Sequence, residues 1–399
     1  MEVHQAEISM SARRCIGYKI VIQRSIKSKV GIVHEWIMIW FPGREKQMLM
    51  KPVKIKDKIL NLPIIQGGMG IGVSRCRLAG AVAKEGGMGV ISTAQVGYDE
   101  PDFWKDPEGA NLRALPVQIR KAKETAGGKG LVAVNIMAVT QLYEEYVKTA
   151  CEAGVDAIIS GAGLPIELPE YAAGYDVSIA PIVSSEKSAR VILRQWDRKY
   201  GRTADFLVIE GPKAGGHLGF SREILDHMEQ LDYAEEIQKI IACKQKFEEK
   251  YETQIPVFVA GGIFTAEDSR HVLELGADGI QTASRFVATE ECDACDAYKQ
   301  AYINAKEEDI VIINSPVGMP GRAVKNAFVT SVSEGEEKIT HCFNCLKACN
   351  PSTAPYCITQ ALINAVKGDL DHGLIFCGSR TGEIHTITTV AEVMRELTV

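Results

Sequence analysis

From residue 62 onward the chain alternates between two patterns of apolar residues. Short, continuous apolar runs predict buried strands at 63–66, 89–92, 131–136, 157–160, 178–183, 206–210, 256–260 and 279–282. Between these runs, apolar residues spaced three or four positions apart predict helices at 74–85, 111–125, 141–153, 165–173, 187–200, 222–250 and 265–275. Several of these helices end at a glycine, which is the usual residue after a helix C-terminus.

This alternation predicts an α/β fold with a parallel sheet. Continuously apolar strands are buried on both faces, and helices between them supply the cover. Because there are eight strand–helix units, we expect a (β/α)8 TIM barrel. The alternative is a doubly wound open sheet. It is less favoured because the first strand is followed by Gln66-Gly67-Gly68-Met69-Gly70, which is not a dinucleotide-binding fingerprint.

The predicted strands end in segments rich in glycine and polar residues. In a barrel these segments meet at one face, where the chemistry of such folds takes place. The sixth run leads into 210–219, where glycines surround His217, and the seventh leads into Ala260-Gly261-Gly262-Ile263. Glycines let backbone N–H groups approach a ligand, and the helix predicted from Thr265 favours an anion at its start. We therefore expect a phosphate-binding cofactor site.

Four segments, 63–70, 210–219, 260–263 and 320–326, together resemble the nitronate monooxygenase (2-nitropropane dioxygenase) family. That family also contains FMN-dependent enoyl-ACP reductases. The resemblance runs in order from about Leu62 to the C-terminus, with a poorer match near residue 350, and Ala214-Gly215-Gly216-His217 is its most specific part. It implies an FMN-binding TIM barrel with His217 beside the flavin ring.

The resemblance also implies which residues bind the flavin. Gly68 and Met69 would lie against it, and Asn135 would form a hydrogen bond near the ring or ribityl chain. The residues implied at the ribityl-phosphate end are Gly215, Gly216, Gly261, Gly262, Gln281 and Ser284. The family usually has Gln-x-Gly-Thr on its eighth strand, whereas this chain has Ala283 and Ser284 in the last two positions. The hydroxyl is kept, and the close backbone approach that glycine allows is in question.

A histidine beside a flavin is compatible with two classes of function. With an ordinary pKa of roughly 6.5, His217 can both take and give a proton near neutrality. It could be the catalytic base in FMN-dependent oxidation of nitroalkanes or alkyl nitronates by O2. Alternatively, it could help protonate carbon in an NAD(P)H-dependent enoyl-ACP reductase, with acyl carrier protein as partner. We favour the first because no motif marks an adenosine-binding pocket. A non-catalytic flavin-binding module would leave His217 without a purpose.

Composition and charge argue against several other classes of protein. The net charge of -6 and pI near 5.9 disfavour nucleic-acid binding. No apolar run approaches the roughly 18 residues that span a bilayer. The 11 cysteines are an odd number, so we expect reduced thiols and a cytoplasmic protein. Nothing in the sequence indicates an oligomeric state.

One cysteine-rich stretch offers a different chemistry. Cys342, Cys345, Cys349 and Cys357 could together hold zinc or an iron–sulfur cluster, because thiolates suit both. Their spacing is not a ferredoxin pattern, and a helix is predicted at 358–366. We therefore expect no metal, and thiols buried in a lid over the barrel mouth.

The chain divides into three expected parts. Residues 1–49 mix basic and β-prone stretches and precede the regular alternation, so they read as an atypical N-terminal extension outside the catalytic fold. A real accessory segment is the alternative. Residues 50–330 would form the FMN-binding barrel, and 331–399 a C-terminal lid that contains the cysteines, followed by closing helices.

Overall fold

A computed structural model of the protein describes residues 8–14, 19–28, 31–40, 50–335 and 337–399. Contacts divide the chain into two compact units, Met1–Leu49 and Met50–Val399. The first unit contains strands β1 (Ile8–Arg14), β2 (Lys19–Ser28) and β3 (Gly31–Trp40), which pair antiparallel in that order. The predicted extension 1–49 thus falls partly outside the described residues. Among those that are described, no helix is long and apolar enough to cross a bilayer.

The second unit is built on a closed barrel of eight parallel strands. They are β6 (Ile64–Gln66), β7 (Met88–Ser92), β8 (Leu131–Met137), β9 (Ala157–Gly161), β10 (Ser178–Val183), β11 (Leu207–Glu210), β13 (Val257–Ala260) and β14 (Gly279–Thr282). All eight predicted strands are present, so the (β/α)8 barrel is confirmed and the open sheet is wrong.

Side chains alternate between two cores along each strand, as the two-residue period of a strand requires. Val90 and Val208 face the barrel interior, whereas Ile91 and Leu207 pack under the outer helices. The hairpin of β4 (Val53–Ile55) and β5 (Lys58–Leu60) adds Ile55 and Leu60 to the interior cluster. The interior is therefore packed, as expected for a barrel of this size.

The outer helices follow the predicted pattern with two corrections. They are α1 (Cys76–Lys84), α2 (Pro107–Ala126), α3 (Tyr143–Glu152), α4 (Leu168–Tyr171), α5 (Glu186–Tyr200), α7 (Tyr233–Tyr251) and α8 (Ala266–Glu274). The helix predicted at 165–173 is only the single turn α4. The helix predicted at 222–250 is broken into α6 (Arg222–Asp226), the 3-10 turn Met228–Gln230 and α7. The cause is a second start signal, since the Asp232 side chain accepts a hydrogen bond from Glu235 N and caps α7.

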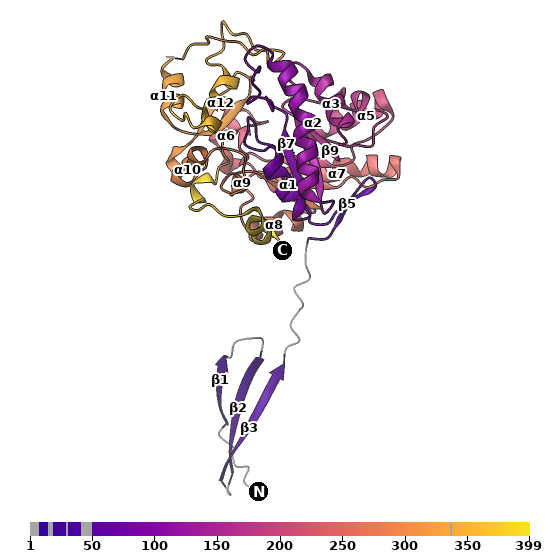
Figure 1. The fold of residues 1–399 in the computed structure, drawn as a ribbon. Helices are drawn as coiled ribbons and strands as arrows, with labels where there is room; N and C mark the ends of the chain where they lie inside the picture. Colours follow the sequence, from indigo (N-terminus) through magenta and orange to yellow (C-terminus); the bar gives the residue numbers. More distant parts are fainter. Residues whose placement is uncertain (1–7, 15–18, 29–30, 41–49, 336) are drawn as a thin grey trace. The chain divides into compact units, whose positions relative to one another are not determined.

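A long segment separates β14 from the last helix, α13 (Val390–Leu397). It contains α9 (Ser284–Val287), α10 (Asp296–Asn304), β15 (Ile310–Asn314), β16 (Pro320–Val324), α11 (Ala327–Glu334) and α12 (Ile358–Lys367). Helices α10, α11 and α12 gather on one side of the barrel (Figure 1). Helix α13 packs against α1, α8 and α9, so it completes the helical layer. Residues 283–389 are thus an insertion between the last strand and its helix.

Candidate functional site

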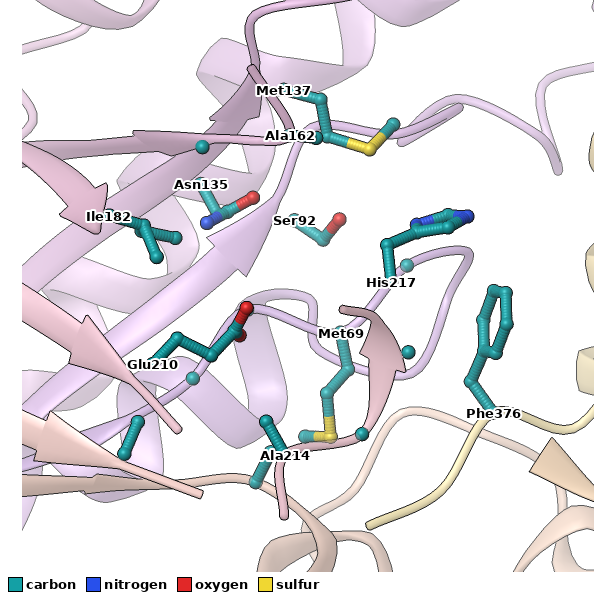
Figure 2. A pocket seen from close by; sticks show the side chains of 18 of the residues that line it. Met69, Ser92, Asn135, Met137, Ala162, Ile182, Glu210, Ala214, His217 and Phe376 are labelled. Carbon is teal, nitrogen blue, oxygen red and sulfur yellow. The ribbon is translucent and has the colours of Figure 1, made fainter. Parts of the chain in front are cut away.

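A cavity of about 430 Å³ opens at the C-terminal ends of the barrel strands. This volume lies within the range of small-molecule sites, about 300–1,000 Å³. All the predicted site residues line it, namely Gly68, Met69, Asn135, Gly215, Gly216, His217, Gly261, Gly262, Gln281 and Ser284. Other barrel loops and the insertion complete the wall, and the insertion contributes residues of α12 and residues 376–380. Figure 2 shows side chains of several strand ends converging on this space.

His217 is held in the cavity by a small antiparallel sheet. The two-residue strand β12 (Gly216–His217) pairs with Gly321 and Arg322 of β16. The buried Arg322 guanidinium donates to the backbone carbonyls of Pro212 and Ala214, which fixes the loop that leads into β12. The insertion therefore fixes the conformation of the loop before His217, which the sequence alone does not determine.

The imidazole of His217 has two close neighbours. Its Nε2 lies 2.8 Å from Ser315 Oγ, and its ring packs edge-on against Phe376 with centroids 4.9 Å apart. Burial lowers the pKa of His217 from its ordinary 6.5 to about 4. The expectation of an unperturbed pKa is therefore wrong. Near pH 7 the imidazole is neutral, so it can accept a proton and is seldom an acid.

Glu210 is a cavity residue that the sequence analysis did not single out. It is the last residue of β11, and its side chain points into the cavity (Figure 2). Burial raises the pKa of this carboxyl group to about 8, so the neutral O–H form predominates at pH 7. The available signal was an acidic residue directly after a fully apolar run, at the strand end where barrel chemistry is found.

Asn135, Gly68 and Met69 form one side of the cavity. Asn135, on β8, points its side-chain amide toward the cavity, and this amide has no hydrogen-bond partner in the described part of the chain. Gly68 allows close packing, because a Cβ there would lie 2.6 Å from Asn135 Cβ. Met69 is fixed by its backbone N–H, which donates to Ser74 Oγ at 2.8 Å. The unpaired amide of Asn135 could form a hydrogen bond with the polar edge of an aromatic ring, and Gly68 has no side chain that would keep such a ring away.

The loop after β13 presents backbone donors to the cavity. Gly261 and Gly262 adopt φ values of 101° and 81°, a left-handed conformation that favours glycine. Their N–H groups have no hydrogen-bond partner among the described residues. Across the cavity, Ser284 Oγ accepts from Gly378 N at 2.9 Å, and the buried Ser379 Oγ has no partner. Two residues with unpaired N–H groups, together with the Ser284 hydroxyl, line one cavity and fit an anionic group such as a phosphate. The Ser379 hydroxyl is fully buried and does not reach this space.

The structure bears on three expectations for the phosphate end of the site. The N–H groups of the two residues just before α8 are not free to bind an anion, because Phe264 N and Thr265 N both donate to Asp268 Oδ2. A Cβ at Gly215 would lie 2.6 Å from the Cys377 backbone, so this glycine is needed for packing of the insertion. At Ala283 φ is −128°, so the backbone conformation there does not require glycine.

Gln281 and Gly216 lie at the cavity in different ways. The Gln281 side chain lies over Gly67, since a Cβ on that glycine would be 3.3 Å from Gln281 Nε2. Gly216 has φ 68°, and nothing lies within 4 Å of where its Cβ would be. Their roles toward a phosphate stay predictions.

The cysteine-rich stretch lies at the edge of the site. Cys342 is exposed, whereas Cys345, Cys349 and Cys357 are partly buried and pack against an apolar cluster around Phe343. Among the described His, Cys, Asp and Glu side chains, no group of three or more is arranged to hold a metal ion. Only Cys345 of these four cysteines lines the cavity.

Comparison with curated proteins gives relatives at low identity. A protein named "Probable nitronate monooxygenase" from Staphylococcus saprophyticus is 25% identical over 305 residues, which cover 69% of this chain and 79% of that protein. A "(3aS,4S,5R,7aS)-5-hydroxy-7a-methyl-1-oxo-octahydro-1H-indene-4-carboxyl-CoA dehydrogenase" from Mycobacterium tuberculosis is 26% identical over 273 residues, covering 68% of this chain and 66% of that one.

Solved structures and a family model complete the comparison. FabK from Thermotoga maritima matches with a TM-score of 0.64 and 26% identity over 84% of this chain and 91% of that one. A nitroalkane oxidase from Streptomyces ansochromogenes has a TM-score of 0.63 at 19% identity over 85% and 95% of the two chains, which shows the fold alone. The family model "Nitronate monooxygenase" matches residues 51–399. The chain is therefore an oxidoreductase that belongs to the nitronate monooxygenase family.

Proposed function

We propose that this protein binds FMN and catalyses the oxidation of nitroalkanes and alkyl nitronates by O2, with His217 as the catalytic base. One observation carries the proposal. A neutral, buried histidine and a set of unpaired hydrogen-bond donors that could bind an anion line the same cavity. The family of the chain and the names of its relatives support the same chemistry.

The cavity residues fit FMN at both ends. The free N–H groups of Gly261 and Gly262, with the hydroxyl of Ser284, would hold the phosphate. Gly68, Met69 and the Asn135 amide would lie along the flavin ring, with Gly216 and Gln281 between the two ends. FMN, when bound, supplies an acceptor for substrate electrons that O2 can reoxidise.

The protein's own contribution is to hold and move a proton. If the Nε2–H of His217 donates to Ser315 Oγ, Nδ1 keeps its lone pair and can accept a proton. For a nitroalkane, the carbon α to the nitro group loses its proton to Nδ1, and the C–H electron pair moves into the nitro group to give the nitronate. Because the pKa of His217 is about 4, the base form is present over the whole neutral range.

Glu210 predicts how activity depends on pH. Its pKa near 8 keeps the carboxyl group neutral at pH 7, whereas above pH 8 a carboxylate would repel the nitronate anion. We therefore expect kcat/KM for a nitronate to fall about tenfold per pH unit above pH 8. In Glu210→Gln this alkaline decline should disappear, as a pH profile from 6 to 10 would reveal. A decline that persists unchanged in the variant contradicts the role of Glu210.

A reductase remains the second candidate, because FabK from Thermotoga maritima shares both fold and 26% identity with this chain. In that case NAD(P)H would supply the electrons, an enoyl thioester on acyl carrier protein would receive them, and His217 would help protonate carbon.

The proposal is tested first by cofactor content. The purified protein should be yellow and release about one FMN per chain on denaturation, since no covalent attachment motif is present. In an oxygen electrode it should consume O2 with alkyl nitronates and without NAD(P)H. A folded, colourless protein that FMN cannot reconstitute would refute the cofactor assignment. Consumption of NAD(P)H with an enoyl thioester, with no nitronate-dependent O2 uptake, would favour the reductase.

A further inference from the structure

One wall of the cavity is apolar and belongs mainly to the insertion. Its members are Met137 at the end of β8 and, from the insertion, Val317, Met319, Leu346, Ile358, Leu362 and Phe376. Leu346, Ile358 and Leu362 are only 8%, 7% and 9% exposed. Thr359 and the Cys345 thiol are the polar groups that α12 and its approach add. Of the charged lining residues, Glu210 and Lys213 lie outside the insertion, and Arg285 and Arg380 lie in parts of the insertion away from α12.

This apolar wall begins at His217. Phe376 packs against the imidazole, and it belongs to the same hydrophobic cluster as Met137, Leu346 and Leu362. The wall is therefore continuous from the proposed base to the inner face of α12. A substrate whose reacting carbon lies at His217 would have apolar surface beside its next carbons.

The wall is also anchored to the barrel. Leu346 forms a β-bridge with Thr140 in the loop after β8, and Lys347 N donates to Val139 O at 3.0 Å. Within the insertion, the buried Tyr356 just before α12 packs its ring edge-on against Phe328 of α11, with ring centroids 5.3 Å apart. The wall is therefore held by the barrel at residues 346–347 and by α11 within the insertion, and close packing keeps its side chains in place.

We propose that this wall binds the hydrocarbon tail of the substrate, and that Leu362 sets the tail length the protein accepts. The inference rests on the proposed function for the position of the reacting carbon. It predicts an aliphatic substrate with a small polar head, since burial of each CH2 is favourable and the wall carries no charge.

The test uses calorimetry to measure the Kd of the FMN-loaded protein for straight-chain alkanoates, from acetate to decanoate. The carboxylate stands in for the nitronate head and does not react. The Kd should fall about three- to fourfold per added CH2 and then stop falling at a definite length. Leu362→Ala should move this break to longer chains, and Leu362→Phe should move it to shorter ones.

Ile363→Ala is the matched control. Ile363 lies on the same helix and is 2% exposed, yet it does not line the cavity. It should lose thermal stability as Leu362→Ala does and keep the wild-type break. A Kd that does not depend on chain length, or a break that moves equally in both alanine variants, would overturn the proposal.

Nitronate-dependent O2 uptake by the same preparation separates this inference from the proposed function. Uptake with a flat chain-length series refutes the tail site alone. A clear chain-length series without any uptake refutes nitronate oxidation and leaves the tail site standing.

Discussion

Replacing His217 by alanine should reduce turnover of neutral nitroalkanes by roughly 10²–10⁴-fold, the usual contribution of a general base. The reason is that the wild-type imidazole is neutral above pH 4 and lies in the cavity, whereas alanine offers no proton acceptor. A nitronate that is prepared in advance needs no deprotonation. Its oxidation should therefore fall much less, with FMN still bound and reducible. Oxygen-electrode traces with each substrate provide the measurement.

A matched histidine serves as control for this experiment. His372 is exposed and bonded to Asp369 at 3.0 Å, outside the cavity, so His372→Ala should leave both activities unchanged. Equal losses on nitroalkane and nitronate in His217→Ala, with FMN retained, would mean that His217 acts in binding or electron transfer and not as a base. Loss of enoyl-thioester reduction in its place would identify the reductase.

Replacing Gly262 by valine should abolish retention of FMN while the barrel stays folded. At φ 81° a β-branched residue is strained by about 1–3 kcal/mol, so the loop must move to relieve it. The new Cβ would also lie 3.0 Å from Lys213 Cβ and Cδ. The N–H groups of Gly261 and Gly262 would then no longer converge on one anion. Flavin absorbance after gel filtration gives the readout.

Gly174→Val separates loss of cofactor from backbone strain. Gly174 has φ 83°, nearly the same conformation, but it is exposed, has nothing within 4 Å of its Cβ position and does not line the cavity. It should lose a similar amount of thermal stability and keep its FMN. Normal flavin content in Gly262→Val would place the phosphate elsewhere.

The barrel could be predicted from the sequence because the same pattern, a short apolar run separated from the next by a helical segment, repeats along the chain. Each strand is a short apolar run buried on both faces, so eight runs gave the architecture even where single helix boundaries were wrong. The break at 227–232 was missed because the cap at Asp232 is one polar side chain inside a long helical pattern. The strand ends also brought the predicted site residues into one cavity, since parallel strands of a barrel finish at the same face.

The remaining parts of the site depend on distant contacts. Ser315 and Phe376 reach His217 from the insertion, and no local pattern in the sequence indicates that they do. The pKa of His217 is likewise set by burial beneath that insertion and not by its neighbours in the chain.

The insertion at 283–389 separates the last strand of the barrel from the helix that completes its outer layer. Loop-closure entropy grows only with the logarithm of length, so a connection ten times longer costs about 2 kcal/mol more to close. A barrel can therefore carry a large or a small segment here at nearly the same stability. Since that segment supplies one wall of the cavity, a change in its length or sequence can reshape the cavity while the strands of the barrel stay as they are.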